Sequence, residues 1–232
     1  MSTYVLVHGA WHGGWCWARV ARLLRDAGHE VFTPTLTGLG ERVHLARPEI
    51  DLALHVRDVV AVLDAEELKS VTLVGHSYGG MVVTGVAARA TARLAHLIYL
   101  DAFVPAAGQK MFDLVPPERA EAMREQARSQ GDGWRVPPWP PERYGVTSAR
   151  DIEWLSRRLT PHPLGTLEQP SEAGAPARGK LSYIYCTKST GSFDQFAERL
   201  REDRKWSFHE LKTGHDAMVT NPGELAKILM GR

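Results

Sequence analysis

The chain has 232 residues, of which 44% are hydrophobic and 24% charged, and its formal net charge is +1. This length suits a single α/β domain, and the hydrophobic content is high enough for a buried core, which excludes a disordered chain. The near-neutral charge, with acidic and basic residues interspersed, argues against binding to nucleic acid or to anionic membranes. The expected partner is therefore a small-molecule substrate.

The first residues, MSTYVLVHGAW, lead directly into a strand-like run without the basic and apolar regions of an export signal. No stretch has the ~18 consecutive apolar residues that a membrane helix needs. The two cysteines, Cys16 and Cys186, lack the spacing of metal ligands and are expected to be buried free thiols rather than a disulfide. These features predict a cytoplasmic protein without a metal site at its cysteines, and a monomer or homodimer is expected.

Short apolar runs alternate with segments of helical periodicity, which is typical of a mainly parallel sheet with helices on both faces. In the first hundred residues, strands are expected at 4–7, 30–33, 71–74 and 97–100. Helices are expected from Trp17 through Leu24 with a stop at Gly28, from an N-cap at Asp51 through Leu63, and over 79–90. The fold class is therefore α/β.

The alternation breaks between residue 104 and about residue 178, where the chain is rich in proline, charge and tryptophan and has no strand signal. So long a departure inside one compact domain is usually functional, so we expect a helical cap inserted into a single domain of residues 1–232. Trp134, Trp139 and Trp154 are expected to form its apolar underside over the catalytic centre, or equally to pack the cap itself.

The α/β rhythm resumes after the cap. Strands are expected at 181–186 and 206–211, with a helix at 193–200 between them. A final helix is expected to begin at Asn221 and Pro222, a cap residue followed by a proline at the first helical position.

The sequence Gly75-His76-Ser77-Tyr78-Gly79 has the G-x-S-x-G pattern, and it lies between an expected strand and an expected helix. The turn is tight and strained, so glycines are needed two residues before and after the serine. Such a turn presents only the serine hydroxyl. Ser77 is therefore the expected nucleophile, and His76 merely fills a variable position; the alternative is a glycine-rich turn without a catalytic role.

A serine hydroxyl needs an adjacent base to accept its proton, and histidine suits that task at neutral pH. Of ten histidines, His215 alone lies in a loop after the last expected strand, and the order nucleophile, acid, histidine goes with this serine motif. His215 is therefore the expected base. The others are expected to be surface or hydrogen-bonded interior residues: His29, His44, His55, His96, His162 and His209. His8 and His12 have no third ligand near them in sequence, so no metal site is predicted.

Acyl transfer also needs two backbone N–H groups at the place where the oxyanion forms. Tyr78 is expected to supply one, and the loop after the first strand the other, from Ala10 with Trp11 in reserve. That loop, HGAWHGGW, could instead be a plain helix-entry turn, and it lacks the G-x-G-x-x-G spacing of a dinucleotide site. Trp11 and Phe103 are expected to line the substrate pocket together with the cap tryptophans.

Three segments, YVLVHGAWHGGWCW, VGHSYGG and the terminal GHD, resemble the small α/β-hydrolases related to plant methyl esterases and hydroxynitrile lyases. The segment at 33–45, TPTLTGLGERVHL, is similar to bacterial esterase-like members that include hydrolases of esters and carbamates. The resemblance covers most of the chain outside the cap. It implies the α/β-hydrolase fold and a cofactor-free enzyme with an apolar pocket. Hydroxynitrile lyases carry a threonine and a lysine where this chain has Gly9 and Asp216, so cyanohydrin cleavage is disfavoured.

An acidic residue is also needed to orient the imidazole of His215 and to stabilise it when it is protonated. In the plant members an aspartate follows the strand that corresponds to 181–186, but this chain has Ser189 there. Asp101, which ends the strand at 97–100, resembles the acid of hydrolases, including some haloalkane dehalogenases, in which it lies one strand earlier. Asp194 is the second choice for the acid. It is expected in the first turn of a helix, where stabilisation of the helix N-terminus alone would explain a carboxylate. Asp216 is not preferred as the acid, because it is too close in sequence to His215.

These residues predict a serine hydrolase that cleaves a small, largely apolar or aromatic carboxylic ester through an acyl-enzyme. Carbamates, amides, lactones and thioesters share the tetrahedral intermediate and stay open as substrates. Two other functions are compatible with the motifs. One is a lyase that uses the same triad without an acyl-enzyme, and the other is a non-catalytic protein that binds a small ligand on a hydrolase fold.

Overall fold

A computed structural model describes residues 1–176, 179–189 and 191–231. At its centre is a six-stranded sheet in the order β2-β1-β3-β4-β7-β8, in which every neighbouring pair is parallel. The strands are β1 (Thr3–Val7), β2 (Glu30–Phe32), β3 (Val71–His76), β4 (Leu94–Leu100), β7 (Lys180–Cys186) and β8 (Trp206–Leu211). The six expected strands are confirmed, with small shifts at their ends.

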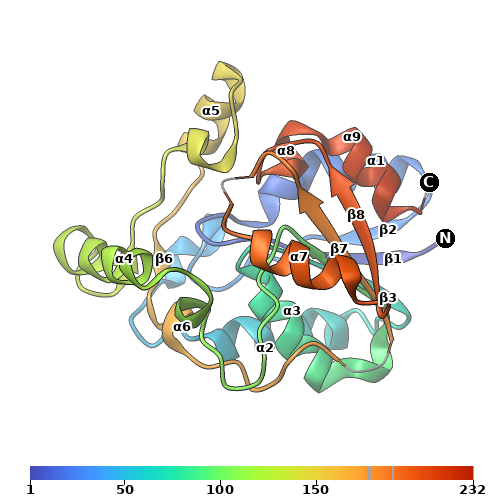
Figure 1. The fold of residues 1–232 in the computed structure, drawn as a ribbon, viewed down its shortest axis with the longest axis horizontal. Coiled ribbons are helices and arrows are strands. Elements are labelled where there is room, and N and C mark those ends of the chain that lie inside the picture. Colours follow the sequence, from blue (N-terminus) through green and yellow to red (C-terminus); the bar gives the residue numbers. More distant parts are fainter. Residues whose placement is uncertain (177–178, 190, 232) are drawn as a thin grey trace.

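Helices cover both faces of the sheet, with α1, α8 and α9 on one side and α2 and α3 on the other (Figure 1). The helices outside the cap are α1 (Ala18–Asp26), α2 (Leu52–Ala65), α3 (Gly79–Ala90), α7 (Asp194–Glu202), α8 (Ala217–Thr220) and α9 (Pro222–Leu229). The expected helices are confirmed, and the Asp51 side chain caps α2 by accepting the N–H of Leu54 at 2.7 Å. The short helix α8, directly after His215, was not predicted.

The core lies between these layers, and β3 is buried at every position. Parallel strands covered on both faces bury consecutive side chains rather than alternate ones. Thus Leu73 and Val74 are both fully buried although they point to opposite faces of the sheet. The same holds for Leu6 and Val7 on the neighbouring strand. Continuous apolar runs therefore replace the alternation of an exposed sheet.

The strand order brings several loops to one edge of the sheet. From β1 the chain moves outward to β2 and then crosses back to β3 on the other side of β1. In open α/β sheets ligands bind beyond the carboxyl ends of the strands at such a reversal. The segments that follow β1, β3, β4 and β8 carry the residues selected from the sequence.

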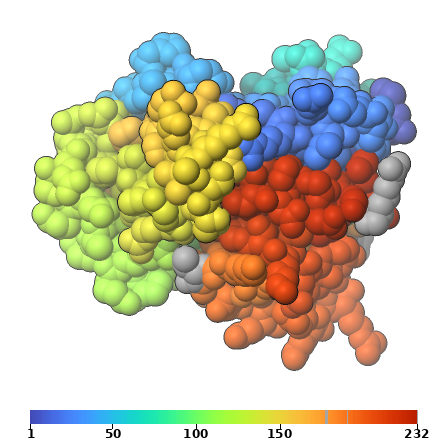
Figure 2. Space-filling view, turned by 90° about the horizontal axis from the view of Figure 1, so that it is seen from above, coloured from blue at the N-terminus to red at the C-terminus, as the bar shows by residue number. Residues whose placement is uncertain are grey.

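The cap segment, residues 104–178, lies between β4 and β7 along the chain, and its described part adds no strand to the central sheet. Its elements are α4 (Pro117–Gln130), β5 (Arg135–Val136), α5 (Ala149–Ser156), β6 (His162–Pro163), α6 (Gly165–Glu168) and the 3₁₀ helices Met111–Leu114 and Pro141–Tyr144. The expectation of no strand was wrong in one detail, because β5 and β6 form a short antiparallel pair. In Figure 2 the green and yellow atoms of this segment form one side of the molecule, beside the red C-terminal residues.

Two expectations drawn from composition are met in the described residues. Cys16 and Cys186 are both buried and free. No helix in the described ranges is long and apolar enough to span a bilayer.

Candidate active site

Ser77 occupies a strained turn between β3 and α3, with a φ of +55° that non-glycine residues rarely adopt. The glycines on either side permit close backbone contacts. A Cβ added at Gly75 would lie 2.7 Å from the carbonyl oxygen of Gly79, and one added at Gly79 would lie 2.8 Å from that of His8. Both approaches are too short for a side chain, which is the reason for the glycine spacing of the motif.

His215 pairs with Asp101 beside this turn. The Nδ1–H of His215 donates to Asp101 Oδ2 at 2.7 Å, and the other carboxylate oxygen, Oδ1, accepts the backbone N–H of Cys186 at 3.2 Å. Asp101 is fully buried and His215 is 9% exposed. With Nδ1 engaged, Nε2 is the nitrogen of His215 that is left for a substrate. In the described part of the chain no hydrogen bond joins His215 to the Ser77 hydroxyl, and such bonds often tighten only when substrate binds.

Asp194, the second choice for the acid, is engaged elsewhere. Its Oδ1 accepts the hydroxyl proton of Tyr185 at 2.7 Å. This hydrogen bond, together with burial and the carboxylate charge, raises the pKa of Tyr185 to about 12. The structure therefore places Asp101, and not Asp194, against His215.

The two proposed oxyanion donors, Ala10 and Tyr78, both line the pocket that contains Ser77. Within the described residues no hydrogen bond uses the backbone N–H of either one. The reserve candidate differs, because the N–H of Trp11 donates to His162 Nδ1 at 3.4 Å. The geometry therefore favours Ala10 over Trp11 as the second donor.

Histidines hold the loop that carries Ala10. His8 Nε2 accepts the N–H of Leu36 at 3.1 Å, so its Nδ1 carries the proton and donates to the Gly9 carbonyl at 2.8 Å. Burial lowers the pKa of His8 to about 3, which keeps this ring neutral. Because a trans peptide directs C=O and N–H to opposite sides, this bond to Gly9 also orients the Ala10 N–H.

A second buried pair behind the site, His12 with Asp216, was missed by the sequence analysis. His12 Nδ1 lies 2.7 Å from the Ala10 carbonyl oxygen, and Nε2 lies 3.1 Å from Asp216 Oδ2. Burial alone would lower the pKa of His12, but the Asp216 carboxylate raises it above its ordinary value. The spacing H-x-x-x-H around Gly9 and Ala10 was the available signal, and it was considered only for metal binding.

His76 also contributes more than a variable motif position. Its Nε2–H donates to the backbone carbonyl of His215 at 3.0 Å, and the two rings lie 4.4 Å apart between centroids. Burial, and the nearby His215, lower the pKa of His76 well below its ordinary value. His76 is therefore a neutral donor that holds the His215 loop against the turn that carries Ser77.

One group of possible metal donors lies here. His76, His215 and Asp216 each have a donor atom within 4.8 Å of the others. Several of their atoms already serve hydrogen bonds, from His76 to the His215 carbonyl, from His215 to Asp101 and from His12 to Asp216. A hydrogen-bond network therefore explains why these side chains lie close together.

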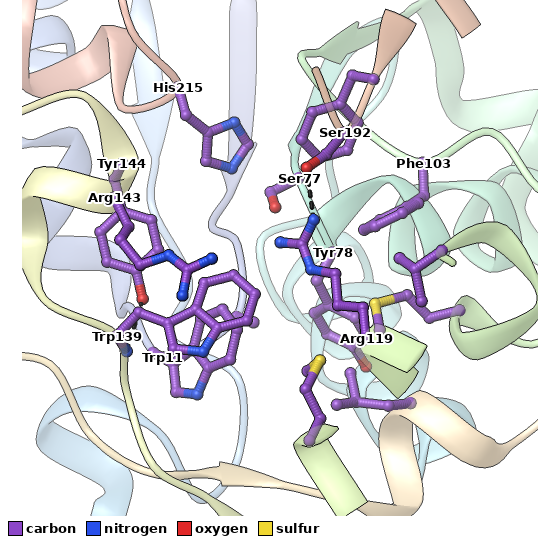
Figure 3. Close-up of a pocket in the computed structure, with 16 residues that line it drawn as sticks. Trp11, Ser77, Tyr78, Phe103, Arg119, Trp139, Arg143, Tyr144, Ser192 and His215 are labelled. Atoms are coloured by element: carbon purple, nitrogen blue, oxygen red, sulfur yellow. Dashed lines mark hydrogen bonds between the residues drawn. The ribbon is translucent and has the colours of Figure 1, made fainter. Parts of the chain in front are cut away.

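The pocket beside Ser77 and His215 lies between the sheet edge and the cap segment (Figure 3), and its empty space, counted out to the open mouth, is about 600 Å³. Its aromatic and aliphatic walls come from both parts of the chain. The apolar and aromatic lining residues are Ala10, Trp11, Tyr78, Phe103, Met111, Val115, Met123, Trp139, Tyr144, Leu167 and Phe193. Of the residues expected to line the pocket, Trp11, Phe103 and Trp139 do so.

The expectation was wrong for Trp134 and Trp154, which do not line this pocket. Trp154 packs edge to face on Trp15, with ring centroids 5.0 Å apart, and the guanidinium of Arg19 lies over its ring. The ring of Trp134 lies under the guanidinium of Arg135. Both rings therefore pack cap residues or join the cap to the N-terminal part of the domain.

The sequence matches the profile of the Alpha/beta hydrolase family over residues 4–228. Over 243 aligned residues it is 39% identical to the carbendazim hydrolyzing esterase of Nocardioides sp. (strain SG-4G), which covers 99% of this chain and 98% of that protein. It is 27% identical over 247 residues to the pheophorbidase of Raphanus sativus, with 98% and 92% of the two chains covered.

Solved structures agree on the fold. An extracellular α/β-hydrolase from a Paenibacillus species is similar with a TM-score of 0.83 and 25% identity, over 99% of this chain and 98% of that one. Tomato methylketone synthase I has a TM-score of 0.82 over 99% and 96%, but at 18% identity this likeness concerns the fold alone. The expected α/β-hydrolase fold and the resemblance to plant methyl esterases and bacterial esterases are confirmed. The chain belongs to the alpha/beta hydrolase family and is an enzyme of the esterase-like hydrolase type.

Proposed function

We propose that the protein hydrolyses small, largely apolar or aromatic carboxylic esters, or closely related carbamates, through an acyl-enzyme on Ser77. The observation that carries this proposal is the buried pair of His215 and Asp101, 2.7 Å apart, at a pocket that also exposes Ser77. The names of two similar proteins, an esterase that hydrolyses carbendazim and a pheophorbidase, support this class of reaction.

In the first half of the reaction, Ser77 Oγ attacks the carbonyl carbon and His215 Nε2 accepts the hydroxyl proton. Asp101 keeps the Nδ1 proton of His215 in place and then stabilises the imidazolium. The carbonyl oxygen becomes an oxyanion that accepts hydrogen bonds from the backbone N–H groups of Ala10 and Tyr78. When the intermediate collapses, the leaving alcohol takes the proton from His215 and the acyl group stays on Ser77.

In the second half, a water molecule attacks the acyl carbon and gives a proton to His215. The tetrahedral intermediate forms again in the same oxyanion site. His215 then returns the proton to the Ser77 oxygen as the carboxylic acid, or the carbamic acid, leaves. The free enzyme is restored with no change in its charge.

The pocket walls support an apolar or aromatic group next to the scissile bond. The rings of Trp11 and Trp139 lie 4.7 Å apart between centroids, and Phe103 packs on Phe193 at 5.0 Å. Such rings contribute a large apolar contact area, and planar groups stack on them. Amides, lactones and thioesters pass through the same intermediate, so they belong in the test as well.

The test is hydrolysis of a panel of 4-nitrophenyl esters of increasing acyl length, together with carbendazim, by the wild type and by Ser77→Ala. The expected result is turnover that falls by a factor of about 10³ or more in Ser77→Ala. A wild type that turns over none of these compounds, yet is labelled at Ser77 by a fluorophosphonate probe, would instead support a lyase that uses the same residues. A wild type that binds the compounds, resists the probe and shows no turnover would support a ligand-binding protein.

A further inference from the structure

Two arginines, Arg119 and Arg143, line the same pocket as Ser77 and His215. Among the described residues that line the pocket, they are the only lysine or arginine side chains, and none of these lining residues carries a carboxylate. In Figure 3 their guanidinium groups come from opposite walls and point toward each other across it. The catalytic steps derived above do not use them.

Neither arginine has a carboxylate partner within the described residues, whereas four other cap arginines are paired and the exposed Arg150 and Arg158 are not. Those ion pairs are Arg124–Glu168, Arg128–Glu121, Arg135–Asp132 and Arg157–Glu153. Arg119 makes one side-chain hydrogen bond, from Nη1 to the Ser192 hydroxyl at 2.5 Å. Among the described cap arginines without a carboxylate partner, Arg119 and Arg143 are the two that line the pocket.

Trp139 holds both guanidinium groups. The Cζ of Arg119 lies 4.6 Å from the centre of the Trp139 ring, and that of Arg143 lies 4.9 Å from it. A cation over an indole face is attracted to the ring, so each guanidinium is held beside the pocket, although Arg143 remains exposed to solvent.

Two like charges held together are unfavourable unless an anion joins them. Burial and, next, the charge of Arg143 lower the pKa of Arg119 below its ordinary value. A carboxylate between the guanidiniums would accept several N–H groups at once and would reverse this effect. None of the described lining residues provides such a group.

We propose that Arg119 and Arg143 form a subsite for an anionic oxygen group, such as a carboxylate, on the part of the substrate remote from the scissile bond. The preferred substrate is then an ester or carbamate that carries a negative charge, with its apolar portion against the aromatic wall. This inference rests on the proposed function for the bond that is cleaved, but the anion site itself is independent of the chemistry.

The test compares pairs of substrates that differ only in charge. The 4-nitrophenyl monoesters of adipic, pimelic and suberic acid carry a free carboxylate, and their primary-amide counterparts have the same shape without the charge. The quantity measured is the ratio of kcat/KM for the acid to that for the amide. In the wild type this ratio is expected to be about ten or more for the chain length that fits. The reason is that a guanidinium binds a carboxylate more strongly than it binds a neutral amide.

The variants Arg119→Gln and Arg143→Gln are each expected to lower the ratio, and the double variant to bring it to about one. Raising the salt concentration should lower the wild-type ratio, because screening weakens exposed charges such as Arg143 most. The matched control is Arg150→Gln, since Arg150 is an exposed arginine on α5 outside the pocket. It is expected to leave the ratio unchanged.

A wild-type ratio of one or less for every chain length, or a ratio that survives in the double variant, would overturn the subsite. If the esters with a terminal amide are hydrolysed in a Ser77-dependent reaction but the expected acid-to-amide ratio is not found, the proposed esterase function stands and the anion subsite is rejected. If nothing is hydrolysed, calorimetric binding of the same compounds to Ser77→Ala still decides. Tighter binding of the acids that disappears in the arginine variants would support the subsite, and equal binding of acids and amides would refute it.

Discussion

Three residues of the site share a backbone conformation that side chains disfavour. Ser77, Asp101 and Trp11 have φ values of +55°, +41° and +64°. Such conformations cost about 1–3 kcal/mol each and persist only where surrounding contacts hold them. The N–H of Ser77 donates to Leu100 at 3.2 Å and that of Asp101 to Ile184 at 2.7 Å, so neighbouring strands fix both turns. The proposed nucleophile, acid and oxyanion loop thus each contain a strained residue, and Glu67, Ser70 and Asp132 outside the site also have positive φ.

The assignment of the acid can be tested by replacing each aspartate separately. Asp101→Asn is expected to lower kcat/KM for esters by a factor of roughly 10³ to 10⁴, because the amide cannot hold the productive tautomer of His215. Asp194→Asn is the matched control and should remain within about threefold of wild type, since its amide oxygen still accepts the Tyr185 hydroxyl and only the charge is removed. The reverse ranking would show that the acid has been assigned to the wrong residue.

The buried pair of His12 and Asp216 is expected to stabilise the fold. Asp216→Asn removes its charge and should lower the free energy of unfolding by about 3 kcal/mol, measured by urea denaturation. The exposed pair of Lys227 and Glu224 gives a control, and Lys227→Ala should cost no more than about 0.5 kcal/mol.

This effect should depend on pH in a defined direction. Because the folded-state pKa of His12 is raised, the pair contributes fully below the ordinary histidine value of about 6.5 and its contribution is lost as the pH rises through the raised pKa. The difference between wild type and Asp216→Asn is therefore expected to shrink in alkaline solution. A difference that grows as the pH rises would contradict the charged state assigned to His12.

At the scale of elements, two tryptophans of the cap segment have different roles. Trp139 lines the pocket between the two arginines, whereas Trp154 packs on Trp15 outside it. Trp139→Leu should lower kcat/KM for aromatic esters by a factor of about ten, through lost stacking. Trp154→Leu should leave kcat/KM nearly unchanged and should instead lower the free energy of unfolding by about 1–3 kcal/mol. Equal losses of activity in both variants would contradict the separate roles assigned to Trp139 and Trp154.

The elements of the sheet were predictable from the sequence because their signals are local. Apolar runs mark buried parallel strands, and Asp51 marks a helix start through its own cap bond. Two-residue strands such as β5 and β6 are too short to show any periodicity, so they escaped notice. Trp134 and Trp154 were placed wrongly for a related reason: composition indicates a cap, but which wall a ring faces depends on packing partners far away in sequence.

The site was predictable to the extent that chain order and the resemblance constrain it. Asp101 was selected by its position at the end of a strand, and the structure places it at His215. The roles of His76 and His12 could not be read from the sequence, because each depends on a contact formed across more than a hundred residues. Arg119 and Arg143 escaped for the same reason, since cap arginines are usually solvated or paired.

For the molecule as a whole, buried neutral histidines predict sensitivity to acid. Burial lowers the pKa of His8 to about 3 and that of His55 to about 4, and lowers those of His76 and His162 well below the ordinary value. Below about pH 6.5 the unfolded chain binds protons that the folded chain does not, so each of these residues costs up to about 1.4 kcal/mol per pH unit. His12 opposes this trend with a single proton.

The urea midpoint of unfolding is therefore expected to fall steadily as the pH is lowered from 6.5 to 4.5. Replacement of His96 by glutamine should make the slope less steep, because burial also lowers the pKa of this part-buried ring to about 4. A midpoint that stays constant over this range would mean that the buried rings are protonated in the folded state.

In the proposed mechanism Ser77 carries the acyl group during turnover. The direct measurement is rapid-quench mass spectrometry of the enzyme mixed with a 4-nitrophenyl ester, followed by proteolysis to locate the adduct. We predict an added mass equal to the acyl group on the peptide that contains Ser77, and none in Ser77→Ala. An adduct on a different residue, or ester turnover by Ser77→Ala at the wild-type rate, would contradict the mechanism.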